Sequence, residues 1–293
     1  MPQRALLLVN PYARQSERSL PQIIKTLHQL GFELIDAYSN QSHLLSDVIR
    51  NYQHQVDIVI VGGGDGTLNA AAKGLVETQL PLGILPLGTA NDLAHTLNIP
   101  TTLYEACQVI ANGQLRQIDL GWVNGQYFFN VASLGLSVQI TQHLNRQLKR
   151  HWGILAYAIS AFKAMWRIRP FFAEIYIDGA LTQLKTVQIT VGNGRFYGGG
   201  MTVCDHATIN DQQLHLSSFS IRHGWQLITL LPALRQGRSL TGRGIHLCQC
   251  QVIDLYTHKP YAINTDGEIT TNTPAHFRVV PKAVNVFLPS KVP

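Results

Sequence analysis

The sequence carries little charge for its length, and it has few cysteines. Asp, Glu, Lys and Arg make up 14% of the 293 residues, against about 25% in an average globular chain. The cysteines stand outside any Cys-x-x-Cys pattern, so neither a zinc site nor a dithiol redox motif is indicated. So low a count is typical of a reducing compartment. The four cysteines are Cys107, Cys204, Cys248 and Cys250.

Long hydrophobic runs are missing as well. The longest charge-free apolar stretch in the basic part of the chain, 152–162, has eleven residues, whereas a helix that spans a bilayer needs about 20. The first ten residues show no apolar core that ends in a cleavage site, so no signal peptide is indicated. We therefore expect a cytoplasmic protein that is soluble or that reaches membranes only from the periphery.

Two stretches of the chain contain no Asp or Glu. From Leu120 to Ala173 there is no Asp or Glu, and the Lys and Arg residues give this stretch a charge of +6, equal to that of the whole chain. A second acid-free stretch runs from Gln212 to Ile253. A local positive field concentrates anionic partners such as a membrane surface or a polyanion. Basic helix faces that are simply exposed to water are the alternative explanation.

The first 117 residues alternate short apolar strands with helical patterns. This alternation predicts an α/β domain, with a parallel sheet covered by helices. Ligands of such folds bind beyond the carboxyl ends of the strands. Strands are predicted at Ala5–Val9, Phe32–Ile35, Asp57–Val61 and Leu82–Leu85, and helices at 20–30, 44–49 and 68–76.

Beyond residue 117 the pattern changes to short alternating runs, which predict a mainly antiparallel β-sandwich over 118–293. Asn124-Gly125 predicts a hairpin turn between strands at 117–123 and 126–131. Helices are predicted at 144–169, with basic residues on both sides of an apolar middle, and at 225–235. Further strands are predicted at 173–177, 186–191, 213–219, 245–251, 262–263, 277–280 and 284–288.

The third predicted strand opens into Gly62-Gly63-Gly64-Asp65-Gly66-Thr67. Successive glycines let several backbone N–H groups face one concavity, and the following helix adds the amides of its N-terminus, so this segment favours a bound phosphate. Asp65 would repel phosphate, and we expect it to order the loop, to contact ribose or to engage a phosphate-bound metal. The spacing fits neither the dinucleotide fingerprint nor a Walker loop. A simple tight turn, the alternative, needs fewer glycines.

A second polar segment, 87–92, follows the fourth predicted strand. Its Thr89 and Asn91 offer a hydroxyl and an amide beside the first glycine segment. The alternative is that Asn91 or Asp92 caps the helix that follows.

A third segment, Asn264-Thr265-Asp266-Gly267-Glu268, lies in the β-rich half. Asp-Gly by itself predicts a hairpin turn. Two carboxylates this close together also suit a base beside a group that holds metal or substrate. Two turn carboxylates exposed to solvent are the alternative.

In this order and at these separations, GGGDGT, PLGTANDLA and NTDGE resemble the diacylglycerol kinase catalytic-domain family, and most of all its bacterial YegS-type lipid kinases. Asn10-Pro11 matches too, as do segments 130–135, 191–194, 197–200 and 209–211, so the likeness covers nearly the whole chain. GGDGT alone is shared with NAD kinases and phosphofructokinases. The full set of motifs is what makes the resemblance specific.

The resemblance implies a two-domain kinase that uses ATP and Mg²⁺, with the active site in the cleft between the domains. Glu268 would accept the proton, and Asp266 would support it or the catalytic Mg²⁺. A second metal site, remote from the chemistry, would consist of Asp211 and the backbone carbonyls of Thr208 and Gln213. The nucleotide would contact Asn10, Ser39, Gly63, Gly64, Asp65, Gly66, Thr67, Leu68, Asn69 and Thr89.

Three positions depart from the family pattern. The first strand is followed by Asn10-Pro11-Tyr12-Ala13-Arg14-Gln15, without the usual lysine, and Arg14 or Arg18 would have to replace an ammonium point charge by a guanidinium fork. Ser39 stands where the family commonly has Thr. Ala70 stands where it commonly has Glu. The missing lysine and Ala70 bear on nucleotide affinity and on the choice of substrate.

The main hypothesis is an ATP-dependent, Mg²⁺-assisted lipid kinase. It would phosphorylate a hydroxyl of a diacylglycerol-like, phosphatidylglycerol-like or sphingoid lipid at an anionic membrane surface, on which the 144–169 helix would dock. A nucleic-acid partner is not expected, because no zinc-finger or RNP-type motif is present. Two alternatives stay open: a soluble NAD kinase-like enzyme, and a weakly active lipid-binding regulatory protein. The oligomeric state, a homodimer included, is also open.

Overall fold

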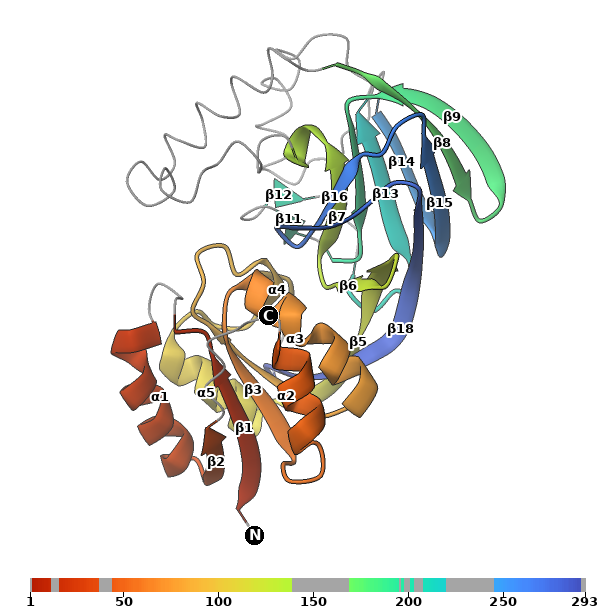
Figure 1. The fold of residues 1–293 in the computed structure, drawn as a ribbon. Coiled ribbons are helices and arrows are strands. Elements are labelled where there is room, and N and C mark those ends of the chain that lie inside the picture. Colours follow the sequence, from red (N-terminus) through yellow and green to blue (C-terminus); the bar gives the residue numbers. More distant parts are fainter. Residues whose placement is uncertain are drawn as a thin grey trace.

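The computed structural model describes residues 2–11, 16–36, 44–138, 169–194, 196–197, 201–202, 208–219 and 245–290. These residues form an α/β lobe and a β lobe, one above the other in Figure 1. The helices predicted at 144–169 and 225–235 lie outside the described residues, apart from Arg169. Ser39 and Arg14 lie outside them as well.

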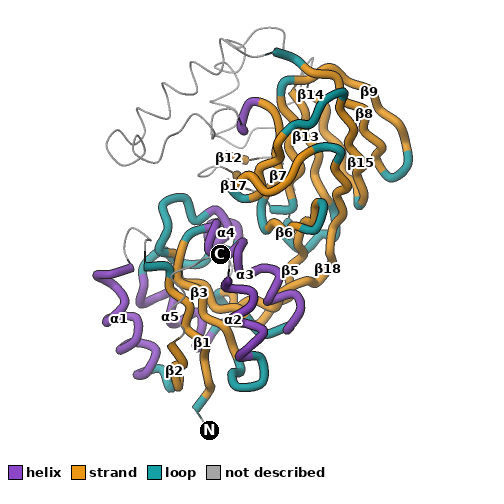
Figure 2. The backbone as a smooth tube through the Cα atoms, in the orientation of Figure 1, coloured by secondary structure: helices purple, strands orange, loops and turns teal. Residues whose placement is uncertain are grey.

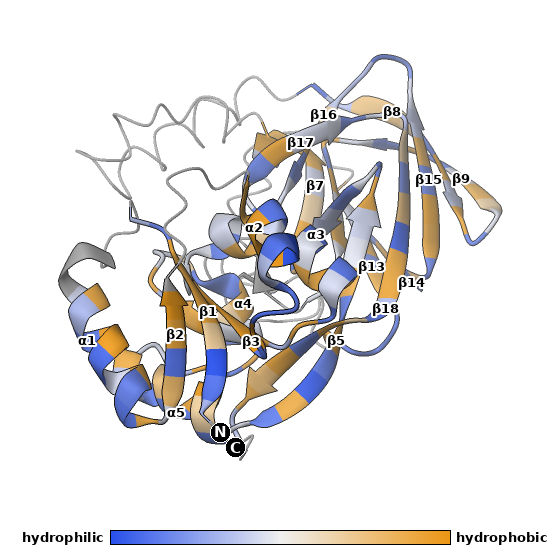
Figure 3. Cartoon of the chain, turned by 60° about the horizontal axis from the view of Figure 1, so that its bottom comes forward, coloured by the Kyte–Doolittle hydropathy of each residue, from blue (hydrophilic) through white to orange (hydrophobic). Residues whose placement is uncertain are grey.

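The α/β lobe contains the parallel sheet that the sequence predicts. Its strands follow the order β2-β1-β3-β4, and each neighbouring pair is parallel. Every residue of β3 and β4 is buried, which is why both read as unbroken apolar runs. Figure 3 shows the hydrophobic residues of this lobe gathered along its strands. The elements are β1 (Gln3–Val9), α1 (Ser16–Gln29), β2 (Phe32–Asp36), α2 (Leu45–Tyr52), β3 (Ile58–Gly63), α3 (Asp65–Thr78), β4 (Leu82–Pro86), α4 (Asp92–Thr96) and α5 (Leu103–Asn112).

The β lobe is a sandwich of antiparallel strands (Figure 2). A six-stranded sheet, β14-β13-β10-β7-β16-β17, packs against β18-β15-β8-β9, and the large side chains of Phe128 and Phe277 are fully buried in this core. The elements are β5 (Gln114–Val123), β6 (Gln126–Phe128), β7 (Val131–Gly135), β8 (Phe171–Ile177), β9 (Ala180–Thr186), β10 (Gln188–Gly192), β11 (Phe196–Tyr197), β12 (Met201–Thr202), β13 (Leu214–Phe219), β14 (Ile245–Cys250), β15 (Val252–Thr257), β16 (Ala262–Thr265), β17 (Glu268–Asn272) and β18 (Ala275–Leu288).

The long strands β5 and β18 join the two lobes. β18 pairs with β15 at one end and with β4 at the other, so one mixed sheet runs through both lobes. Val284 and Val286 are buried in the α/β core, although they were predicted as part of the second domain. The predicted boundary after residue 117 also falls inside β5. The last strand of the chain thus returns to the first lobe, so the two lobes are not two separate stretches of sequence.

β18 also replaces the two separate strands that were predicted at 277–280 and 284–288. Its pairing with β5 shifts register between Val280 and Val284, and Lys282 there has a φ of 52°. An irregularity of this kind bends a strand without ending it. The interruption in the sequence pattern therefore marks a bend, not a loop.

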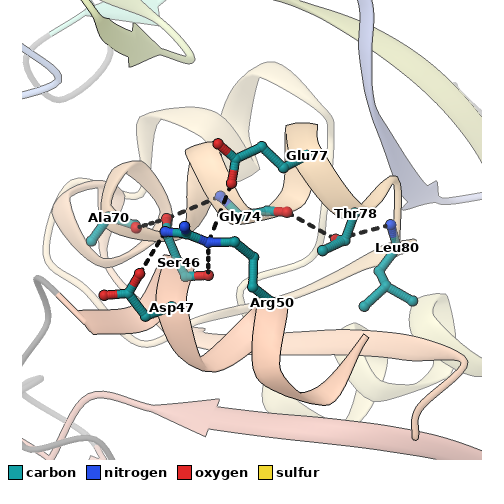
Figure 4. A network of polar contacts seen from close by, with 8 residues as sticks. All are labelled: Ser46, Asp47, Arg50, Ala70, Gly74, Glu77, Thr78 and Leu80. Carbon is teal, nitrogen blue, oxygen red and sulfur yellow. Dashed lines mark hydrogen bonds and ion pairs between the residues drawn. The ribbon is translucent and has the colours of Figure 1, made fainter. Parts of the chain in front are cut away.

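Helix α3 is held against α2 by close backbone packing (Figure 4). A Cβ on Gly74 would lie 2.8 Å from the Cα of Ser46, so only glycine allows this approach. The Ser46 hydroxyl donates to the carbonyl oxygen of Ala70 and accepts from the Gly74 amide. The carbonyl of Ala70, the residue that replaces the usual Glu, thus takes part in fixing the helix that begins at the glycine segment.

Candidate active site

The glycine segment is shorter as a loop than the sequence suggested. Gly62 and Gly63 are the last residues of β3, and α3 begins at Asp65, whereas the helix was predicted from Leu68. Only Gly64, in an extended conformation, separates strand from helix. The first turn of α3 therefore lies directly at the carboxyl end of the sheet. The amides of Thr67 and Leu68 already donate to the carbonyl of Gly64, at 2.9 and 3.2 Å, so the amides of Asp65 and Gly66 are the ones that precede the helix ladder.

A second glycine brings the neighbouring strand end into contact with this turn. A Cβ on Gly88, which follows β4, would lie 2.5 Å from the Cα of Gly64. Real Cβ atoms do not approach backbone so closely, so the two segments meet backbone to backbone. Asn91 holds the second segment, since its side-chain oxygen accepts from the Gly88 amide and its NH₂ group donates to the Gly88 carbonyl.

Asp65 links the two segments by hydrogen bonds, and this accounts for a negative charge in a segment that favours phosphate. Its carboxylate oxygens accept hydrogen bonds from the amides of Asp92 and Leu93, at 3.1 and 3.0 Å. Asp65 thus caps α4 from another helix, whereas Asn91, the residue before the helix, makes no capping bond with its side chain. Of the roles we considered for Asp65, the structure supports the ordering of the loop.

Asn10 contacts the same turn from the end of β1. Its amide donates to the carbonyl of Gly62 at 2.9 Å, and its side-chain NH₂ group donates to the Thr67 hydroxyl at 3.1 Å. A Cβ on Gly63 would overlap the Thr67 side chain, at 2.5 Å from its Oγ1. Three of the residues that the resemblance assigns to nucleotide binding, Asn10, Gly63 and Thr67, thus meet at the first turn of α3.

Two other predicted nucleotide contacts are placed differently. The side chain of Leu68 is 2% exposed and packs in the α/β core, so only its backbone is available to a ligand. Thr89 is exposed in the segment after β4.

Glu268 reaches this turn from the other lobe. It is the first residue of β17, and Figure 2 shows this end of the β lobe above α3 and α4. Its Oε1 atom lies 3.1 Å from the position that a Cβ of Gly66 would occupy. The absence of a side chain at Gly66 therefore leaves room for the Glu268 carboxylate against the first turn of α3, where the helix dipole favours negative charge. Glu268 is itself exposed, so it stays accessible to a ligand.

Asp266 occupies the hairpin turn that Asp-Gly predicted, and both turn residues have positive φ, at 47° and 98°. Its carboxylate accepts four hydrogen bonds. Three come from the backbone amides of Phe129, Asn130 and Val131, at 2.7 to 3.0 Å, and one comes from the Asn69 side chain, at 2.9 Å. Each oxygen therefore carries two bonds, which leaves no lone pair for a metal.

The protonation of Asp266 reflects two opposed effects. Burial of the carboxyl raises its pKa to about 6, because the charged form loses its hydration, while the hydrogen bonds from the backbone amides and from Asn69 lower the pKa. The turn residue as a whole keeps some exposure, but its carboxylate points inward to these donors. Of the two predicted roles, support of Glu268 fits this environment and Mg²⁺ binding does not.

The predicted second metal set lies together in the turn 208–213. The Asp211 carboxylate there accepts bonds from the backbone amides of Thr208 and Gln213, at 3.1 and 3.0 Å, and contacts the buried His215 ring at 2.9 Å. Burial raises the pKa of Asp211, but these bonds and the charge of His215 outweigh it and lower the pKa. The predicted metal site also uses the backbone carbonyl oxygens of Thr208 and Gln213, which these contacts do not test, so the site stays a prediction. In the part of the chain that the structure describes, no three His, Cys, Asp or Glu side chains gather into a metal site.

Sequence reasoning missed a buried polar network beneath the site. Asp119, which is 2% exposed, accepts bonds from the amides of Gln212 and Lys282, both at 2.7 Å. Asn193 donates to the carbonyls of Asp119 and Phe129. Asn130 and Asn193 belong to the matching segments 130–135 and 191–194, so motif resemblance marked them without assigning a role.

Comparison with known proteins identifies the family. Residues 4–123 match the family model described as the diacylglycerol kinase catalytic domain, and residues 130–288 match the YegS C-terminal NAD kinase beta sandwich-like domain. A probable lipid kinase YegS-like protein of Klebsiella pneumoniae (strain 342) is 33% identical over 282 residues, which cover 93% of each chain. The chain therefore belongs to the family of diacylglycerol kinases and YegS-like lipid kinases, as its motifs predicted.

Other relatives agree. A diacylglycerol kinase of Bacillus subtilis (strain 168) is 27% identical over 297 residues, covering 98% of this chain and 97% of that protein. A solved structure of a putative diacylglycerol kinase from Bacillus anthracis str. Sterne superposes with a TM-score of 0.84 at 24% identity, covering 98% of this chain and 95% of that one. This likeness confirms the predicted fold class, an α/β domain followed by a mainly antiparallel β domain.

Proposed function

We propose that this protein is an ATP-dependent lipid kinase whose general base is Glu268. One observation carries the proposal: a carboxylate from the β lobe lies against the first turn of α3, beside Gly66. Phosphoryl transfer to an alcohol needs little more than a place for the phosphates, charge neutralisation and a group that takes the hydroxyl proton. The contact between the two lobes at Gly66 supports a site to which both lobes contribute.

The α/β lobe supplies the phosphate site. The first turn of α3 offers backbone amides and the positive end of the helix dipole, and Asn10 and Thr67 border it. Each oxygen of Asp65 accepts one backbone hydrogen bond, so this carboxylate is the group that would hold a hydrated Mg²⁺, which neutralises phosphate charge during transfer. Glu268 would take the proton of the attacking hydroxyl as that proton becomes acidic in the transition state.

The names of the relatives support a lipid acceptor, and we propose a diacylglycerol-like, phosphatidylglycerol-like or sphingoid lipid that is reached at an anionic membrane surface. Among the described residues, no helix combines the length and apolar character needed to cross a bilayer. The basic stretch from Leu120 to Ala173 supplies the positive charge that attracts such a surface.

A panel assay tests the proposal. Purified protein is incubated with labelled ATP and Mg²⁺, with vesicles of each lipid class or with NAD as acceptor, and the products are identified by mass. We expect a phosphorylated lipid. We also expect Glu268→Gln to lower kcat by about 100-fold or more, whereas the matched control Glu77→Gln, an exposed glutamate at the far end of α3, keeps full activity. Phosphorylated NAD would support the soluble alternative. Equal trace transfer by wild type and Glu268→Gln would instead favour a regulatory lipid-binding protein.

A further inference from the structure

Asn69 connects the two lobes through one side chain. It lies in the second turn of α3, and its NH₂ group donates to the carbonyl of Tyr127 in β6 and to Oδ2 of Asp266, both at 2.9 Å. The two acceptors belong to different hairpins of the β lobe. Both hydrogens of the amide are thus engaged in holding that lobe, although the family resemblance places Asn69 among the nucleotide contacts.

Asp266 extends this connection to the rest of the turn through further hydrogen bonds. Its carboxylate also accepts bonds from the three successive amides Phe129–Val131, and its own amide donates to the carbonyl of Val131 at 2.9 Å. The turn that carries Glu268 is therefore tied to the start of β7 and to α3 through a single carboxylate. Two residues beyond Asp266, the Glu268 carboxylate lies against Gly66.

Gly66 and Asn69 are three residues apart on α3, so they lie on the same face of the helix. One face of α3 therefore receives Glu268 and, one turn further on, holds the turn from which Glu268 extends. A change in the position of the β lobe would alter both contacts together.

We propose that Asn69 is a positioning residue, and that the Asn69–Asp266–Tyr127 contacts form an interlobe latch that sets the Glu268 carboxylate over the first turn of α3. The inference rests on the proposed function, because the latch matters for catalysis only if Glu268 is the general base. It differs from a nucleotide-contact role in what it predicts. Loss of the latch displaces the base and leaves the phosphate site intact, whereas loss of a nucleotide contact weakens ATP binding.

The kinetic test uses Asn69→Ala and Asn69→Asp, the latter placing a carboxylate opposite Asp266. We expect kcat to fall by about 10- to 100-fold, since small displacements of a catalytic group have effects of this size. The Kd for ATP, measured by calorimetry, should stay within about twofold. Asn285→Ala is the matched control, because that side chain also donates to a backbone carbonyl, Gln79 at 3.3 Å, but at the opposite end of α3. It should keep the wild-type kcat.

A second measurement does not depend on activity. Hydrogen–deuterium exchange should show faster exchange of the amides Phe129–Val131 in Asn69→Ala and no change in Asn285→Ala. A weaker Kd for ATP with unchanged kcat would overturn the proposal in favour of a nucleotide contact. If these amides exchange in Asn69→Ala as they do in the wild type, the contacts of Asn69 do not hold the turn, and the latch does not exist. If they exchange faster but kcat is unchanged, the latch exists but does not position Glu268. If the wild type phosphorylates no acceptor, the proposed function fails, whereas the exchange experiment still decides whether the latch exists.

Discussion

The two sides of the candidate active site are built in different ways. On the α/β side, the strand ends of β3 and β4 meet through Gly64 and Gly88, with backbone against backbone. On the β side, the turn that carries Glu268 is held by the Asp266 carboxylate, which accepts four hydrogen bonds. The first arrangement depends on the absence of side-chain volume, and the second depends on a charged group and its donors.

This difference shows why the two sides should respond to different perturbations. Added volume should damage the glycine side, whereas a change in protonation should act on the Asp266 turn. The contact between α2 and α3, which involves neither the strand-end glycines nor Asp266, serves as a reference.

The largest effect should come from the pH dependence of the Asp266 turn. Folding raises the pKa of this carboxyl from 3.8 to about 6, so the folded protein binds the proton more tightly than the unfolded chain. The contribution of this carboxyl to stability is therefore full below pH 3.8 and is lost as the pH rises through 6, by roughly 3 kcal/mol at most. Asp266→Asn cannot titrate, so its stability relative to wild type should improve between pH 4.5 and 7.5.

Urea unfolding of both proteins at several pH values measures this difference. Asp266→Asn also turns a donor toward backbone amides, so it should be less stable overall, and only the change with pH bears on the prediction. A difference in unfolding free energy that stays constant across this range would show that the carboxyl does not titrate with the raised pKa.

A smaller effect is expected on the glycine side. Gly88→Ala places a Cβ 2.5 Å from the Cα of Gly64, so the strand ends must separate, at a cost of about 1 to 3 kcal/mol. ATP affinity should fall with it. Gly66→Ala is the matched control, because its Cβ meets only the flexible end of Glu268, at 3.1 Å. It should keep stability but lose kcat. Thermal unfolding measures the stability of the two variants, and calorimetry measures their affinity for ATP. Equal losses of stability in Gly88→Ala and Gly66→Ala would contradict the prediction.

The smallest effect belongs to the reference region. Arg50 pairs with Asp47 at 2.5 Å and with Glu77 at 3.2 Å, and all three side chains are at least 39% exposed (Figure 4). Arg50→Met should therefore cost below about 1 kcal/mol of unfolding free energy, with less effect at high salt. Its kcat should equal that of wild type. A loss of kcat would mean that the α2–α3 contact controls the site.

Local pattern predicted the α/β lobe well. Its strands are apolar runs bounded by glycine or by helical spacing, and all four were located with errors of one or two residues at their ends. The start of α3 was missed, because Asp65-Gly66-Thr67 reads as loop when glycine is taken as a breaker. In the fold, the absence of a side chain at Gly66 leaves room for the Glu268 carboxylate.

The β lobe was predicted less completely. β7, β9, β15 and β17 were not predicted as separate strands, because each adjoins a neighbour through a turn of one or two residues. The two-residue strands β11 and β12 were not predicted either. The return of strand β18 to the α/β core was not predicted, because no local pattern indicates which sheet a strand joins. The roles of Asp65, Asn69 and Asp266 also depended on partners that are 27 to 197 residues away in the chain.

The sequence by itself determined the parallel lobe, the glycine strand ends and the family, because these depend on residue types at short, fixed spacings. Only the tertiary structure decided that Asp65 caps α4, that Asp266 is fully occupied by hydrogen bonds and that Asn69 holds the turn below Glu268. A carboxylate or an amide can serve many purposes, and its purpose is set by which donors and acceptors the fold brings to it.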